Sequence, residues 1–189
     1  MPRIPSRRDM LKLSTGLASG IAVGVVAAQR SSVSTGLAQE ASAVSYQKKA
    51  ESLGITFEKQ TPGYLNKCVR SGNHLITSGH TSKIKGKLGA DLTTAQGSEA
   101  ARECAVQILQ SVWNTHGTLD GLRVLKVLGC VNCTPEFIEQ PAVVNGCSDL
   151  LHEIFGKTTD GYHARSALGF VSLPSGVAVE VEAIFEIKS

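Results

Sequence analysis

The segment "VAVEVEAIFEI", residues 177–187, constrains the fold most, because its polarity alternates without a break. One set of alternate positions is apolar throughout: Val177, Val179, Val181, Ala183, Phe185 and Ile187. The other set carries three glutamates: Ala178, Glu180, Glu182, Ile184 and Glu186. Successive side chains of a strand point to opposite faces of its sheet. The pattern therefore predicts a strand with one face in the core and the other facing water or a partner.

The stretch before it, "HARSALGFVSLP" over 163–174, predicts a second strand and a hairpin closed by Ser175-Gly176. In that register Arg165 lies opposite Glu186, on the glutamate face. A cross-strand ion pair, worth about 0.2–1 kcal/mol, is then one explanation for the arginine.

The same register separates Arg165 from Glu180. Glu180 pairs near Val171, six residues from Arg165, or roughly 20 Å along the strand at ~3.3 Å per residue. The two charges can therefore meet only if two copies of the chain bring their sheets together. A face that mixes charges with Ala, Leu and Ile is typical of a subunit interface with a polar pocket.

Two helices are predicted upstream. Thr93 and Gln96 have the spacing of a capping box, apolar residues recur at helical period from Ala101 to Val112, and Gly117 ends the helix. A second helix begins near Pro141, a favourable first-turn residue, and stops at Gly156.

The remaining pattern is one of strands and loops. "GITFEK" (54–59), "KCVRSGNHLITSG" (67–79, with a turn at Ser71-Gly72-Asn73) and "LRVLKVLGCVNC" (122–133) predict strands. "HTSKIKGKLGADL" (80–92) predicts a solvated loop, since its spacing matches no phosphate-binding motif. The order β-β-β-α-β-α-β-β predicts an α+β fold, a mixed sheet of about six strands with two helices packed on one face.

The first 43 residues are typical of a twin-arginine (Tat) export signal. "SRRDMLK" (6–12) precedes an apolar, Gly/Ala-rich run from Leu13 to Ala28, and "ASA" at 41–43 predicts cleavage near Ala43. This predicts a periplasmic or otherwise exported protein. An uncleaved membrane anchor is the alternative, although about 16 apolar residues are short for a bilayer. Residues 44–54 then form a flexible or helical lead-in, and 55–189 the domain.

Charge gives no reason to expect nucleic-acid binding. The predicted signal holds five of the 19 basic residues and two of the 16 acidic ones, so residues 44–189 carry 14 of each. The mature chain is therefore neutral, and nucleic acid is not an expected partner. A membrane is not an expected partner either, once the predicted signal is cleaved.

The five cysteines favour buried structural roles. Cys130 and Cys133 have redox or zinc spacing but lie in a strand, where residues three apart face opposite ways. No second Cys/His cluster completes a tetrahedral zinc set. We expect no metal site and no cofactor.

Three motifs resemble the RidA/YjgF family: "HARSALGFVSLPSGVAVEVEAIFEI" (163–187), "NHLITSG" (73–79) and "AVVNGCSDLLHEIFG" (142–156). The resemblance covers about residues 55–188. It is strongest to a divergent branch with segments similar to "ADLTTAQGSEAAR" and "EQPAVVNGCSDLL". It implies a chorismate-mutase-like fold and a homotrimer with three clefts between subunits.

The resemblance also implies a function, the hydrolytic deamination of small enamine or imine carboxylates such as 2-aminoacrylate to 2-oxo acids and ammonia. By motif position Arg165 binds the substrate carboxylate and Glu180 acts on the hydrolytic water. Tyr64, Ser78 and Asn145 are the other implied substrate-binding residues. A guanidinium suits the first role because its fork matches a carboxylate, and a carboxylate can orient or deprotonate water.

Other functions stay open. The family's archetype has a cysteine where this chain has Ala167, and "HTS" (80–82) replaces its usual Gln-hydrophobic-Pro. The alternative is a non-catalytic protein that binds a small carboxylate through Arg165; the ribonuclease activity reported for some relatives comes third. The histidines are expected to be solvated or structural, although His163 is close enough in sequence to line the Arg165 pocket.

Overall fold

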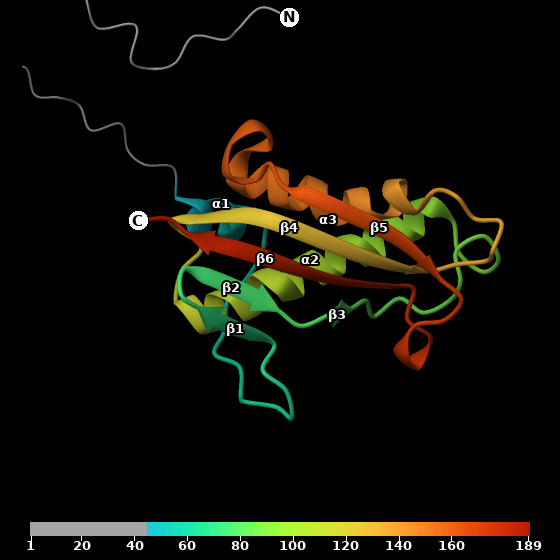
Figure 1. Cartoon of the computed structure of the whole chain (residues 1–189), viewed down its shortest axis with the longest axis horizontal. Helices are drawn as coiled ribbons and strands as arrows, with labels where there is room; N and C mark the ends of the chain where they lie inside the picture. The colour runs from blue at the N-terminus through green and yellow to red at the C-terminus, as the bar shows by residue number, and fades with distance from the viewer. Residues whose placement is uncertain (1–44) are drawn as a thin grey trace, which may run out of the picture. The chain divides into compact units, whose positions relative to one another are not determined.

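A mixed sheet of six strands forms one layer of the computed structural model, which describes residues 45–189 (Figure 1). The predicted export signal lies outside the described residues. The strands are β1 (Cys68–Ser71), β2 (His74–Thr77), β3 (His80–Thr81), β4 (Leu122–Asn132), β5 (Ala164–Phe170) and β6 (Val179–Ile187). Their order is β1-β2-β6-β4-β5, with β3 also paired to β6. Strands β4 and β5 are parallel and every other pair is antiparallel.

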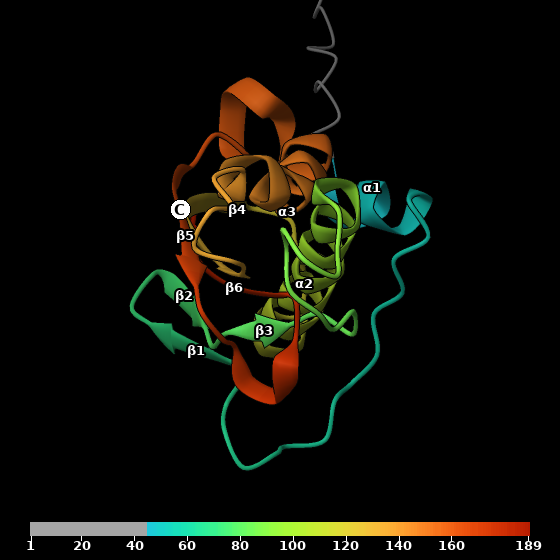
Figure 2. The same ribbon diagram turned by 90° about the vertical axis from the view of Figure 1, so that its right-hand side faces the viewer.

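The helices α2 (Thr94–His116) and α3 (Gln140–Phe155) cover one face of this sheet (Figure 2). The capping box at the start of α2 is present, with Thr93 and Gln96 bonded to each other's backbone N–H groups. Gly117 ends α2 in the left-handed conformation that favours glycine. The predicted α+β class and the placement of two helices on one face are thus confirmed.

Strand β6 has the faces that its alternation predicts. Its apolar residues Val179, Val181, Ala183 and Phe185 are buried against the helices. Glu180, Glu182, Ile184 and Glu186 lie on the opposite, open face, where no helix of the described chain packs. The core of the domain therefore lies between the sheet and the pair α2–α3.

The expected hairpin between 163–174 and 177–187 is wrong. Both strands pair with β4, which lies between them, and Arg165 is in register with Val127 rather than with Glu186. The physical reason is that α3 carries the chain from the end of β4 back to the start of β5, which makes these two strands parallel neighbours. A short 3₁₀ turn, Pro174–Gly176, then leads to β6 on the other side of β4.

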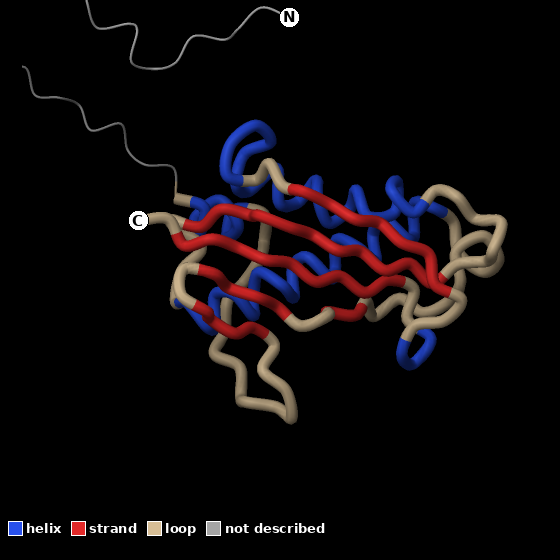
Figure 3. The backbone as a smooth tube through the Cα atoms, viewed as in Figure 1, coloured by secondary structure: helices blue, strands red, loops and turns tan. Residues whose placement is uncertain are grey.

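Two further expectations differ. Residues 54–59 form no strand, because side chains of α2 bond the backbone of this segment and of the residue after it: the N–H groups of Glu58 and Gln60 donate to Gln110 and Asn114. The segment between the lead-in helix α1 (Tyr46–Ser52) and β1 instead stands away from the sheet as a long loop (Figure 3).

The loop 80–92 is less solvated than expected. Leu88 is fully buried, and its backbone exchanges hydrogen bonds with the end of β4, through Asn132 and Thr134. The ammonium of Lys87 donates to the side-chain oxygen of Asn132 at 2.9 Å. Packing on the core thus fixes a loop whose composition alone reads as polar.

Close contact between the two long helices depends on Gly146. A Cβ at this position overlaps the backbone carbonyl of Ser98 in α2, and a backbone atom cannot move aside cheaply. We expect Gly146→Ala to lower the free energy of unfolding by about 1–3 kcal/mol through overpacking, measured by urea denaturation. Glu153→Ala on the exposed side of α3 is the control, with an expected change below about 0.5 kcal/mol. Equal stability of the two variants would contradict this packing argument.

Candidate functional site

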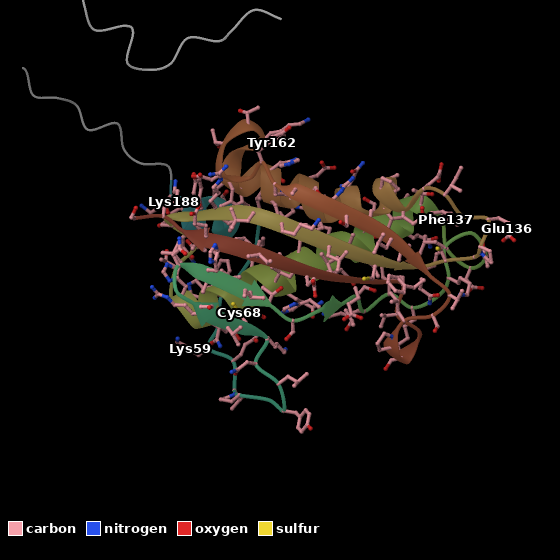
Figure 4. All side chains as sticks on the ribbon, viewed as in Figure 1. Lys59, Cys68, Glu136, Phe137, Tyr162 and Lys188 are labelled. Carbon is pink, nitrogen blue, oxygen red and sulfur yellow. The ribbon has the colours of Figure 1, made fainter. Side chains whose placement is uncertain are left out.

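A polar hollow of about 330 Å³ lies where α3, the turn that follows it and the start of β5 meet. It is lined by Asn145, Ser148, Asp149, His152, Lys157, Tyr162, His163 and Arg165. Every lining side chain ends in a polar or charged group, including the exposed phenol of Tyr162, which is labelled beside the turn in Figure 4. Such a lining suits a small charged ligand better than an apolar one.

Arg165 is held in this hollow by one of its terminal nitrogens. Nη1 donates to Oδ1 of Asn145 at 2.8 Å and to Oγ of Ser148 at 3.1 Å. A guanidinium has five N–H donors, two of them on Nη1. Among the described residues no side chain bonds Nη2 or Nε, and no acid lies within ion-pair distance of Arg165. The Nε/Nη2 edge is therefore available to a ligand.

Ser148 continues the contact to His163. Its Oγ lies 3.1 Å from Nε2 of His163, and Nδ1 of the same ring lies 2.6 Å from the carbonyl oxygen of Gly161. A second imidazole, that of His152, lies beside it with ring centroids 5.1 Å apart. Arg165 thus belongs to a hydrogen-bonded chain that runs through Ser148 and His163 to the backbone.

Both imidazoles have lowered pKa values. Burial is the main cause for His163, and the neighbouring charges of His152 and Arg165 lower its pKa further, while the bond to Gly161 opposes them. Burial also lowers the pKa of His152, helped by Lys157 and Arg165 and opposed by Asp149. The neutral form of each ring is favoured near pH 7.

Glu180 lies on the other side of the sheet from Arg165. Arg165 is in register with Val127, and Glu180 with Cys130, three residues further along β4. Residues in register share a face, and residues three apart on a strand do not. Arg165 therefore faces α3, while Glu180 lies on the open face. The sheet itself separates them within one chain, not the strand length expected from the hairpin.

Glu180 has its own surroundings. It is half-buried, its carboxylate has no hydrogen-bond or ion-pair partner among residues 45–189, and it lies directly against Gly79, where a Cβ would overlap that carboxylate. Next to Gly79, Ser78 donates its hydroxyl to the carbonyl of Asn66 at 2.8 Å. His80 fixes this turn, since Nδ1 contacts the Ser78 carbonyl and Nε2 contacts Ser111 in α2.

The implied site residues thus form separate groups. Arg165 and Asn145 meet in the hollow; Glu180 lies beside the Ser78 turn on the open face. Tyr64 is fully exposed on the loop between α1 and β1 and belongs to neither group. One chain contains no position where all five converge.

Sequence reasoning did not assign Ser148 to the site, and it expected His152 to be solvated or structural. The signal that could have found them is the spacing of Asn145, Ser148, Asp149 and His152, which places four polar side chains on one face of α3. Lys157 and Tyr162 carry no such signal, because the turn after α3 places them.

Within residues 45–189 no group of three or more His, Cys, Asp or Glu side chains is arranged to hold a metal ion. Four cysteines are buried and all five are free thiols. Of the helices described, none has the length and apolarity required to span a membrane.

Residues 60–180 match the family model described as "YjgF/chorismate_mutase-like, putative endoribonuclease". The curated protein TCP17 of Trypanosoma cruzi is 43% identical over 128 residues, which cover 64% of this chain and 79% of that protein. Two solved structures share the fold, each with a TM-score of 0.69 and each covering 76% of this chain.

The first of these structures is Atu1372 from Agrobacterium tumefaciens, a protein of unknown function; it is 36% identical, with 94% of its chain covered. The second is a protein from Shewanella oneidensis MR-1, described as a putative endoribonuclease; it is 26% identical, with 99% covered. The family match extends over most of the described domain, and the strand and helix order agrees with it. The chain therefore belongs to the YjgF/chorismate-mutase-like (RidA) family.

Proposed function

We propose that the protein hydrolyses small enamine or imine carboxylates, such as 2-aminoacrylate and its imine tautomer, to a 2-oxo acid and ammonia. The observation that carries the proposal is the free Nε/Nη2 edge of Arg165, which lies in a polar hollow and has no ion-pair partner among residues 45–189. Such an edge pairs with a carboxylate through two parallel hydrogen bonds, which fixes both position and orientation.

The reaction needs few protein groups. Water adds to the imine carbon and forms the new C–O bond, the C–N bond then breaks, and the nitrogen leaves as ammonia with protons taken from water. Arg165 holds the carboxylate, and Glu180 orients the water or accepts its proton. Oxidation states balance without a redox partner, so the step requires no cofactor.

The proposed reaction needs a second copy of the chain to bring Arg165 and Glu180 together, because the two residues lie on opposite faces of one sheet. We place the complete site at a cleft between subunits of a homotrimer. Supporting this, the open face of the sheet and its margins expose apolar side chains, among them Ile76, Leu168 and Phe170. Tyr64, exposed on its loop, is available to reach a neighbouring subunit.

A non-catalytic carboxylate-binding protein is the second candidate. Ala167 favours it, since this half-buried residue two positions from Arg165 has no group that exchanges a proton. Arg165 alone suffices to bind a carboxylate. The name of the Shewanella relative adds ribonuclease activity as a third outcome to be tested.

The test is ammonia release from 2-aminoacrylate generated in situ by a pyridoxal-phosphate lyase. We expect the purified protein to accelerate release above the spontaneous rate, with equimolar 2-oxo acid formed. If the protein binds pyruvate but does not accelerate ammonia release, the result would support the non-catalytic binding function over the enzyme. Cleavage of a single-stranded RNA with no effect on ammonia release would select the ribonuclease.

We also propose export by the twin-arginine route. Arg7 and Arg8 precede the apolar run, and replacing both with lysine keeps the charge while removing the arginine pair. We expect the double substitution to keep the protein in the cytoplasm of a Tat-competent bacterium, whereas Arg3→Lys leaves export unchanged. Fractionation followed by mass determination of the mature N-terminus measures both outcomes. Periplasmic protein from the double variant would contradict the route.

A further inference from the structure

The proton positions in the chain from Gly161 to Arg165 follow from the geometry. A backbone carbonyl only accepts, so Nδ1 of His163, 2.6 Å from the Gly161 oxygen, carries a proton. In the neutral ring Nε2 is then an acceptor. Oγ of Ser148, 3.1 Å away, must donate its single proton to Nε2.

The bond to His163 fixes the orientation of the Ser148 hydroxyl beside Arg165. A guanidinium has donors only, so Oγ accepts from Nη1, at 3.1 Å, while the hydroxyl proton is directed to Nε2. Asn145 accepts the other Nη1 proton at 2.8 Å. Both protons of Nη1 are used, and the planar guanidinium is oriented with its Nε/Nη2 edge free.

We propose that His163 is a positioning residue which, through Ser148, orients Arg165 for carboxylate binding and takes up a proton when the carboxylate binds. The inference rests on the proposed function, since it concerns the ligand of the same site. Nothing in the motif resemblance assigns Ser148 or His163 this role.

The charges around His163 give the direction of the proton effect. Facing it are Asp149 and His152 of α3, Lys157 of the following turn, Tyr162, and Arg165 of β5. Burial lowers the pKa of His163 in the free protein, His152 and Arg165 lower it further, and the bond to Gly161 opposes them. A bound carboxylate adds a negative charge that favours the imidazolium, so the pKa of His163 rises on binding. Carboxylate affinity therefore increases as pH falls from about 8 toward about 5.5, the range in which His titrates.

Protonation leaves the orientation of Arg165 intact. Once Nε2 also carries a proton, it donates to Oγ of Ser148. That oxygen has two lone pairs, so it still accepts from Nη1. The Ser148 hydroxyl keeps its proton, which no longer bonds to Nε2 and can turn toward the ligand.

The experiment measures pyruvate binding by calorimetry from pH 5.5 to 8, in buffers with different heats of ionisation. We expect wild type to bind with proton uptake and to gain about 3- to 10-fold in affinity at low pH. His163→Gln places an amide oxygen near Nε2, so it should bind like wild type at pH 8 and lose the pH dependence. His163→Leu and Ser148→Ala should each bind about 3- to 10-fold more weakly at pH 8, the cost of one lost hydrogen bond.

The outcomes separate the two proposals. If wild type binds pyruvate at no pH but still accelerates ammonia release, only this inference fails; if it does neither, the proposed function fails as well. If wild type binds but His163→Leu matches it at pH 8, only the positioning role fails. A gain in pyruvate affinity at low pH that persists in His163→Gln and disappears in His152→Gln would assign the proton uptake to His152. Nitrogen NMR of the free protein provides an independent check: a bare Nδ1 on His163 would overturn the tautomer.

Discussion

Arg165→Ala is expected to lower kcat/KM for 2-aminoacrylate hydrolysis by at least about 100-fold and to abolish measurable pyruvate binding. The substitution removes two charge-assisted hydrogen bonds to the carboxylate, each worth about 1.5–3 kcal/mol. Steady-state ammonia release and calorimetry measure the two effects. Arg165→Lys keeps the charge and loses the planar fork, so we expect it to retain partial binding, about 10-fold weaker than wild type.

Stability should change little, because Arg165 makes no ion pair in the described chain and its two hydrogen bonds go to side chains beside an open hollow. Arg102→Ala is the matched control: this half-exposed arginine lies on α2 with its one carboxylate contact at 3.9 Å. We expect full activity from it. Equal activities of the two alanine variants would remove Arg165 from the site.

How much of this site the sequence could predict depends on the kind of contact involved. The faces of β6 and the ends of α2 follow from local alternation and capping, so residues such as Thr93 and Gly117 were sufficient. The position of β4 between β5 and β6 is a long-range pairing. No residue in 163–187 encodes it, and the expected Arg165–Glu186 register failed for that reason.

The surroundings of Arg165 show the same limit. Asn145 came from a motif, and Ser148 shares its helix face, so periodicity could have added it. His163 contacts Ser148 only because the turn Gly156–Asp160 brings the chain back over α3. A π-type turn of this kind, which starts at a glycine with positive φ, leaves little trace in hydrophobic pattern.

Glu180→Gln should abolish hydrolysis while leaving carboxylate binding within about 3-fold of wild type. General acid–base groups contribute about 10²- to 10⁴-fold to a rate, and the amide cannot accept the proton of water. The Glu180 carboxylate has no hydrogen-bond or ion-pair partner in the described chain, so the isosteric change breaks no such interaction there. Glu182→Gln, two residues along the same face of β6, is the control, and we expect normal activity from it.

Mixing the two inactive variants tests whether each site spans two chains. In a ring of three subunits, each such site takes Arg165 from one copy and Glu180 from the next copy around the ring. The site is intact only where the first copy retains Arg165 and the next retains Glu180. An equal, random mixture of Arg165→Ala and Glu180→Gln chains therefore restores about one quarter of the sites. Co-refolding followed by the ammonia assay should recover about 25% of wild-type activity. Mixing without subunit exchange should recover none.

The opposite result is equally informative. A site built within one chain contains one defect in every copy, so no mixture of the two variants can be active, whatever its assembly. The structure argues against that outcome, because the sheet lies between Arg165 and Glu180 and neither charge has an ion-pair partner among residues 45–189. Two unpaired charges on opposite faces become complementary when a second copy presents its open face to the hollow of the first. The recovered activity therefore measures directly whether the proposed site takes its residues from two chains.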